Sequence, residues 1–167
     1  PVAHRRMPVV WRKQLTTGNE LIDLDHKYLL SLFNSIELAI SKPELLRYLP
    51  VFFKQLLDFS KEHFAREERI QLKIQYPGFA QHKQGHQRLL DHLAALGEKI
   101  EAELGPLHDG CDHHHDALEH VEGDLEAIRQ RLESGVVSIA REWVIDHVVK
   151  SDKQVLPYLR DLPPNFA

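Results

Sequence analysis

Histidines and a glutamate recur in this sequence at spacings that place them on one face of a helix. His63 and Glu67 are four residues apart, and so are His82 and His86. Each pair would therefore project from the same side of its helix. A lone imidazole or carboxylate on a buried face is costly, and the cost is removed when both bind a metal ion. These two pairs predict a buried metal site.

Three further residues of the same types lie on apolar helical stripes. His26 continues the helical spacing of Ile22 and Leu29. His147 and Asp152 are five residues apart, which in an ideal α-helix separates side-chain directions by about 140°. We expect either that they reach a common point from two flanks of the stripe or that a π-helical widening brings them together. The predicted metal ligands are His26, His63, Glu67, His82, His86, His147 and Asp152.

Seven ligands are too many for one metal ion and suit two. If both carboxylates and one solvent-derived oxygen bridge the ions, the five histidines divide as three and two. One ion is then six-coordinate, and the other keeps one open position at which a diatomic molecule could bind. Imidazole with bridging carboxylate favours iron, with manganese and zinc as competitors, and zinc would bring no redox chemistry.

Four amphipathic helical patterns position these residues. The first follows a capping-box pattern, Thr17 with Glu20, and the second follows Pro43 and runs to about residue 74. The third begins after the turn at 76–78, and the fourth spans about 135–159. Off the apolar stripe of the second helix we expect a solvated charged face, made by Lys61, Glu62, Arg66 and Glu68. The predicted fold is an all-α, up-down-up-down four-helix bundle.

The chain has the size of one domain, so we expect residues 1–167 to form a single bundle. Residues 1–19 are predicted to be an N-terminal arm, and residues 101–134 an inserted loop or helix between the third and fourth helices. Cys111 and the neighbouring histidines 113–115 in this insert are either solvated or a second metal site. Both ends look cut, which predicts that the chain is one domain of a longer polypeptide.

Composition argues against several classes of protein. The formal net charge is −4 and no cluster of Lys and Arg is interleaved with aromatic residues, so a nucleic acid is not expected as a partner. No apolar run approaches the ~20 residues that cross a membrane, and no signal-peptide pattern opens the chain. A single cysteine agrees with a reducing compartment. We therefore expect a cytoplasmic protein without a membrane partner.

The order and spacing of the seven predicted ligands resemble the signature of the hemerythrin family. The match covers residues 11 to 160 apart from the insert, which lengthens the segment between His86 and His147. Other residues that agree with the family pattern are Trp11, Gly18, Ile22, Asp23, Phe64, Tyr76, Pro77, Trp143 and Lys153.

The resemblance implies a non-haem di-iron centre that binds dioxygen reversibly. His82, His86 and His147 would hold the closed iron, His26 and His63 the open one, and Glu67 and Asp152 would bridge them. An apolar pocket would protect the bound oxygen, with Leu29, Phe64, Trp143 and Val144 as its expected walls. Asp23 and Glu62 are candidates for orienting the histidines, although surface charge is the simpler explanation for both.

Two alternatives to oxygen binding for carriage or storage stay open. One is an oxygen or redox sensor that controls a fused or interacting signalling domain, such as a diguanylate cyclase. The other is a di-iron oxidase or peroxidase, which is disfavoured because the Glu-x-x-His pattern of such bundles does not occur in the sequence. The domain itself is thus expected to bind oxygen and not to be an enzyme. Whether two copies form a homodimer stays open.

Overall fold

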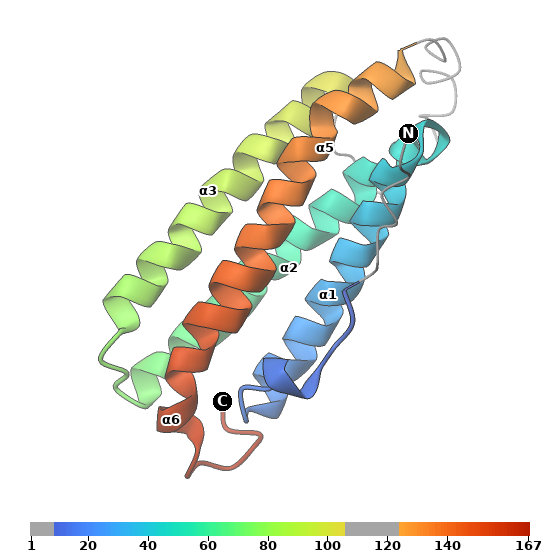
Figure 1. Ribbon diagram of the computed structural model, residues 1–167. Helices are drawn as coiled ribbons and strands as arrows, with labels where there is room; N and C mark the ends of the chain where they lie inside the picture. The colour runs from blue at the N-terminus through green and yellow to red at the C-terminus, as the bar shows by residue number, and fades with distance from the viewer. Residues whose placement is uncertain (1–8, 106–123) are drawn as a thin grey trace.

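Four long helical segments lie side by side and alternate in direction along the chain (Figure 1). The computed structural model describes residues 9–105 and 124–167. The first three segments are α1 (Glu20–Ser41), α2 (Leu49–Lys73) and α3 (Phe79–Leu104). The fourth is continuous, from α5 (Leu125–Arg141) through a π-helix, η3 (Glu142–Ser151), and a 3-10 helix, η4 (Asp152–Val155), into α6 (Leu156–Leu159). For the described residues, the predicted all-α bundle is confirmed.

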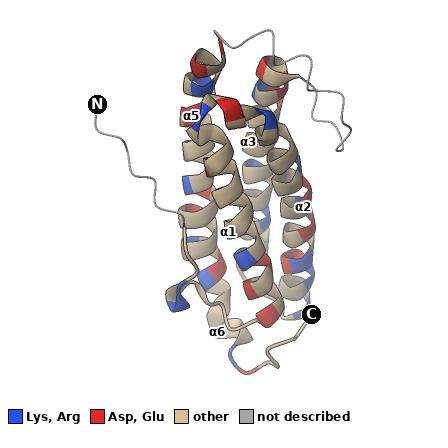
Figure 2. Ribbon diagram, turned by 90° about the vertical axis from the view of Figure 1, so that its right-hand side faces the viewer, with Lys and Arg blue, Asp and Glu red and all other residues tan. Residues whose placement is uncertain are grey.

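The bundle buries its apolar residues in two clusters of unequal size. The larger cluster runs along the inside of all four helices and includes Phe33, Phe53 and Trp143. The smaller lies toward the start of α1 and the end of the fourth segment, where Ile22 packs with Val155. Acidic and basic residues are interspersed along the helices (Figure 2). No helix among the described residues combines the length and apolar character that a membrane span requires.

The start of α1 differs from the predicted capping box. Asn19 is the N-cap, and its side-chain oxygen accepts hydrogen bonds from the backbone N–H groups of Leu21 and Ile22. The Thr17 hydroxyl donates instead to Oδ1 of Asp23 at 2.8 Å. The prediction was wrong because asparagine is as good a cap as threonine, and the chain offers both within three residues.

The described part of the arm contacts α1, and the link between α1 and α2 is short. Val9 exchanges two hydrogen bonds with the side chain of Asn34, both 2.9 Å long, and a short 3-10 helix, η1 (Lys13–Leu15), follows. Pro43 begins a 3-10 helix, η2 (Pro43–Tyr48), and α2 itself begins only at Leu49. Proline at this position starts a helical turn as predicted, but the turn is tighter than an α-helix.

The fourth segment is longer than predicted. It was expected from Gly135, but α5 begins at Leu125 and Gly135 lies inside the helix. A Cβ at Gly135 would lie 2.9 Å from Cδ1 of Leu96 on α3, so the residue permits a close approach of two helices. The sequence was expected to start its fourth helix at this glycine, whereas the helix continues through it and the glycine serves its packing on α3. Residues 106–123, which include the predicted Cys111 site, lie outside the described residues.

Candidate metal centre

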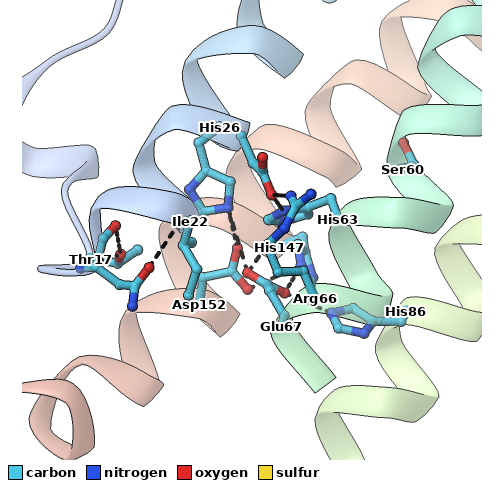
Figure 3. Close-up of polar contacts among 12 residues, drawn as sticks. Thr17, Ile22, His26, Ser60, His63, Arg66, Glu67, His86, His147 and Asp152 are labelled. Atoms are coloured by element: carbon cyan, nitrogen blue, oxygen red, sulfur yellow. Dashed lines mark hydrogen bonds and ion pairs between the residues drawn. The ribbon is translucent and has the colours of Figure 1, made fainter. Parts of the chain in front are cut away.

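Five histidines and two carboxylates converge between the two apolar clusters. They come from all four helical segments of the bundle (Figure 3). Each of the seven is buried, with at most 7% of its surface exposed. These are the seven residues predicted from the sequence: His26 on α1, His63 and Glu67 on α2, His82 and His86 on α3, His147 on η3 and Asp152 on η4.

The carboxylate of Glu67 divides its two oxygens between two groups of histidines. Oε1 lies 3.2 Å from Nε2 of His63 and 3.7 Å from Nε2 of His26. Oε2 faces the other three histidines through their Nε2 atoms, at 3.0 Å for His86, 3.5 Å for His82 and 3.6 Å for His147. Glu67 therefore lies between a two-histidine half and a three-histidine half.

Asp152 repeats this division from the opposite segment. Its Oδ2 lies 2.8 Å from Nε2 of His26, in the two-histidine half. Its Oδ1 lies 3.0 Å from Nε2 of His147 and 3.1 Å from Nε2 of His82, in the three-histidine half. Both carboxylates thus present one oxygen to each half, which is the arrangement that two bridged metal ions require.

Several of these atoms are short of hydrogen bonds although they are buried. Among the described residues, Nε2 of His26, His63, His82 and His147 and both oxygens of Asp152 make no aligned hydrogen bond. Buried polar atoms are normally paired, so a shared group at the centre would satisfy them. Two sets of ligand atoms, each within 4.8 Å of one another, could hold an ion: His26, His63, Glu67 and Asp152, and Glu67, His82, His86, His147 and Asp152. The donor types fit iron, manganese or zinc.

A π-helix brings Asp152 to the centre. The backbone N–H of Asp152 donates to the carbonyl of His147, five residues earlier, so the turn holds one residue more than an α-helix. Of the two geometries left open by the sequence, the widening is the one that the structure adopts. Nε2 of His147 and Oδ1 of Asp152 thereby come to lie 3.0 Å apart.

The two carboxylates raise the pKa of three histidines of the cluster. Burial alone would lower the pKa of His26, but Asp152 and Glu67 beside it raise the pKa to about 10. The same balance raises the pKa of His82 to about 10 and of His147 to about 9. Burial would raise the pKa of Glu67, yet the neighbouring imidazoles, His63 first, hold it well below its usual range. The raised pKa values mean that His26, His82 and His147 hold a proton near neutral pH when no metal ion is bound.

Aromatic rings enclose the centre on the side of the larger apolar cluster. Trp143 is fully buried, and its ring centroid lies 5.5 Å from that of His63 and 5.2 Å from that of His147. Phe64 stacks between Trp143, at 5.2 Å, and His86, at 4.1 Å. The indole N–H of Trp143 donates to Oγ of Ser60. The other two expected pocket residues, Leu29 and Val144, are buried in the same cluster.

Two acidic residues that hold histidines from behind were missed by the sequence analysis. Asp25 lies 3.0 Å from Nδ1 of His63, and Glu68 lies 3.0 Å from Nδ1 of His86. Glu68 had been assigned to the solvated face, and it is partly exposed there, but it also reaches the buried ring of His86. The two candidates named instead do other things, since Asp23 bonds to Thr17 and Glu62 is exposed.

Arg66 was assigned to the solvated face as well, and it is also partly exposed there. Its guanidinium forms an ion pair with Asp25. A signal for this pair was present in the sequence: on α1, position 25 lies beside the stripe of Ile22, His26 and Leu29, so an aspartate there needs a partner.

Comparison with known proteins finds sequence similarity to one family. Residues 17–159 match the family model described as the hemerythrin HHE cation binding domain. The chain is 25% identical over 140 residues to a bacteriohemerythrin from Stenotrophomonas maltophilia (strain R551-3). The aligned region covers 80% of this chain and 88% of the relative. It is also 28% identical over 97 residues to a hemerythrin-like protein from Naegleria gruberi. That aligned region covers 58% of this chain and 76% of the relative.

Proposed function

The chain belongs to the hemerythrin family, and from this membership and the geometry of its buried cluster we propose that it holds two iron ions and binds dioxygen reversibly at one of them. Reversible binding would serve carriage, storage or sensing alike. His82, His86 and His147 are the proposed ligands of one iron, His26 and His63 those of the other, and Glu67 and Asp152 the bridges.

One observation carries the proposal. Glu67 and Asp152 each direct one oxygen to the two-histidine half and the other to the three-histidine half. A single ion would leave two or more of the buried imidazoles without a partner, which is costly in a dry interior. Two ions give every Nε2 atom of the cluster a ligand role.

The unequal halves support an open coordination position. The two-histidine set has four protein ligands, and the three-histidine set has five. An ion in the two-histidine half therefore has more room for an external molecule. When bound, two ferrous ions would together supply two electrons to dioxygen. The ring of Trp143 adjoins both halves, since it contacts His26 and His63 on one side and His147 on the other.

The apolar residues beside the cluster would keep water and protons away from the bound molecule. Leu29, Phe64, Trp143 and Val144 are the proposed walls, and each is at most 7% exposed. Because the indole N–H of Trp143 is occupied by Ser60, the ring presents apolar surface to the site. Excluding water in this way suppresses loss of the bound ligand to side reactions.

The test is to load the metal-free protein with ferrous iron without air and then to cycle oxygen. We expect about two irons per chain and a visible absorption band that appears with oxygen and disappears when oxygen is removed. A variant without the shared carboxylate, Glu67→Gln, serves as the control and should show neither. Two bound irons whose spectrum never responds to oxygen would refute oxygen binding, and protein that takes up no iron would refute the metal centre itself.

A further inference from the structure

Two of the five histidines contact a carboxylate through Nδ1, the ring nitrogen that faces away from the cluster, and one of them lies in each half. In the two-histidine half, Nδ1 of His63 lies 3.0 Å from Oδ2 of Asp25. In the three-histidine half, Nδ1 of His86 lies 3.0 Å from Oε1 of Glu68. In contrast, Nδ1 of His26 is buried without a hydrogen-bond partner among the described residues. Of the two ligands proposed for the open iron, only His63 is therefore anchored in this way.

The two anchors differ in strength because their surroundings differ. Asp25 is 8% exposed, and the Arg66 guanidinium is in close contact with Oδ2, the oxygen that faces His63. Glu68 has a more exposed side chain, and its partner Lys83 is 60% exposed with Nζ at 3.5 Å. The Arg66 side chain is 30% exposed, half the exposure of Lys83, and a charge-assisted hydrogen bond whose partners are less exposed is stronger than a solvated ion pair. The Arg66–Asp25–His63 chain is thus the firmer of the two.

The hydrogen-bonded series Arg66–Asp25–His63 matters for metal binding because it acts on the ring nitrogen that faces away from the ion. A neutral imidazole carries one proton, and a carboxylate at Nδ1 keeps that proton on Nδ1, which leaves the Nε2 lone pair directed at the ion. The Nε2 atom of His63 indeed lies on the opposite side, 3.2 Å from Oε1 of Glu67. Arg66 reaches Asp25 from α2, the helix that also carries His63 and Glu67, so the pair ties α1 to α2 at the level of the cluster.

We propose that Asp25, held by Arg66, is the positioning residue for the two-histidine half, which fixes the tautomer and ring orientation of His63 and so sets the affinity of that half for its metal ion. This inference rests on the proposed function, because it assigns the residues that prepare one half of the same centre. Glu68 plays the weaker counterpart role for His86.

The test uses zinc, which occupies imidazole and carboxylate sites without any oxygen chemistry. The metal-free protein and its variants are titrated with zinc while the histidine rings are followed by ¹⁵N NMR. Asp25→Asn is chosen because the amide can donate to Nδ1 and favour the wrong tautomer, and Asp25→Ala removes the partner altogether. Arg66→Gln and Arg66→Lys probe the second link. Glu62→Gln and Arg69→Gln are matched controls at exposed positions of α2.

In the wild type we expect a slowly exchanging Nδ1 proton on His63 and the binding of two zinc ions. Asp25→Asn and Asp25→Ala should lose that proton signal and weaken one of the two binding steps about 10- to 100-fold. Arg66→Gln should weaken the same step by a smaller factor, and Arg66→Lys should restore it in part. The controls should match the wild type.

An Asp25→Asn variant with an unchanged His63 tautomer and unchanged zinc affinity would overturn the inference. Weakening of both steps equally would overturn it as well, because Asp25 would then act on the fold and not on one half. The proposed function fails separately, through iron-loaded protein that does not respond to oxygen, since the zinc titration and the NMR signal involve neither iron nor oxygen.

Discussion

The backbone N–H of Asp152 donates a hydrogen bond to the carbonyl of His147, and this five-residue contact places both side chains in the same cluster. In a regular α-helix the fifth residue points about 140° away from the first. The π-helix adds one residue to the turn, so Asp152 takes the position that the fourth residue would occupy in an α-helix. The local backbone distortion therefore brings Asp152 into the site.

This relationship predicts opposite effects for a deletion and an insertion. Deleting Lys150, whose side chain is exposed, should convert the segment to a regular α-helix with aspartate four residues after His147, and metal binding should survive. Inserting an alanine after Lys150 should turn Asp152 about 100° away and cost at least one metal ion per chain. Metal content and circular dichroism of both variants check this. A folded insertion variant with full metal content would contradict it.

Glu67→Gln should abolish binding of both metal ions, because the glutamine has one carbonyl oxygen where the carboxylate presents an oxygen to each half. Glu62→Gln, five residues earlier on the same helix and exposed, should bind metal as the wild type does. Titration with ferrous iron or zinc followed by elemental analysis gives the result. The shared role of Glu67 would be wrong if the variant lost the metal of one half and kept the other at full occupancy.

The stability of the metal-free protein should fall as the pH rises above neutrality. Despite burial, Asp152 and Glu67 raise the pKa of His26 and His82 to about 10 and of His147 to about 9, whereas an unfolded histidine titrates near 6.5. A raised pKa contributes stability that is complete below about pH 6.5 and is lost as the pH rises through about 9 to 10. Urea unfolding of the metal-free protein between pH 6 and 10 measures this loss.

Metal binding should show the reverse dependence, because the ions displace those protons. The stabilisation that zinc or iron confers should therefore increase between about pH 6 and pH 9. Metal-free protein whose unfolding free energy stays level or rises over this range would show that the carboxylates do not hold protons on the histidines.

Ser60→Ala should destabilise the protein by about 1–3 kcal/mol, because it leaves the buried indole N–H of Trp143 without an acceptor. Ser60 is itself fully buried. Ser35→Ala is the matched control, since its hydroxyl bonds to the carbonyl of Ser31 on the exposed side of α1, and it should change stability by less than about 0.5 kcal/mol. Equal losses in the two variants, measured by urea unfolding, would contradict a specific role for the Ser60–Trp143 hydrogen bond.

Much of the centre follows from helical periodicity alone. His63 with Glu67, and His82 with His86, occupy positions of apolar stripes, and a polar residue in such a position must find a partner. The same reasoning places His26 on a buried face and requires a special geometry for His147 and Asp152. The bundle itself follows from four such stripes and short connections.

What periodicity could not supply are contacts between residues on different helices. Asp25 and Arg66 each look like ordinary charges on their own helices, and only the packing of α1 on α2 brings them together. The fourth helix was expected to start at Gly135, because glycine is a poor helix former, whereas its role depends on Leu96 of a neighbouring helix. Thr17 was predicted to cap α1, whereas Asn19, an equally good capping residue two positions later, does so in the structure.

The most direct test of the two-metal centre is anomalous diffraction at the iron edge from crystals of the iron-loaded protein. We predict two iron peaks per chain, one beside His26 and His63 and one among His82, His86 and His147, each bonded to one oxygen of Glu67 and one of Asp152. A single peak between the two halves, or iron bound elsewhere on the chain, would contradict the account.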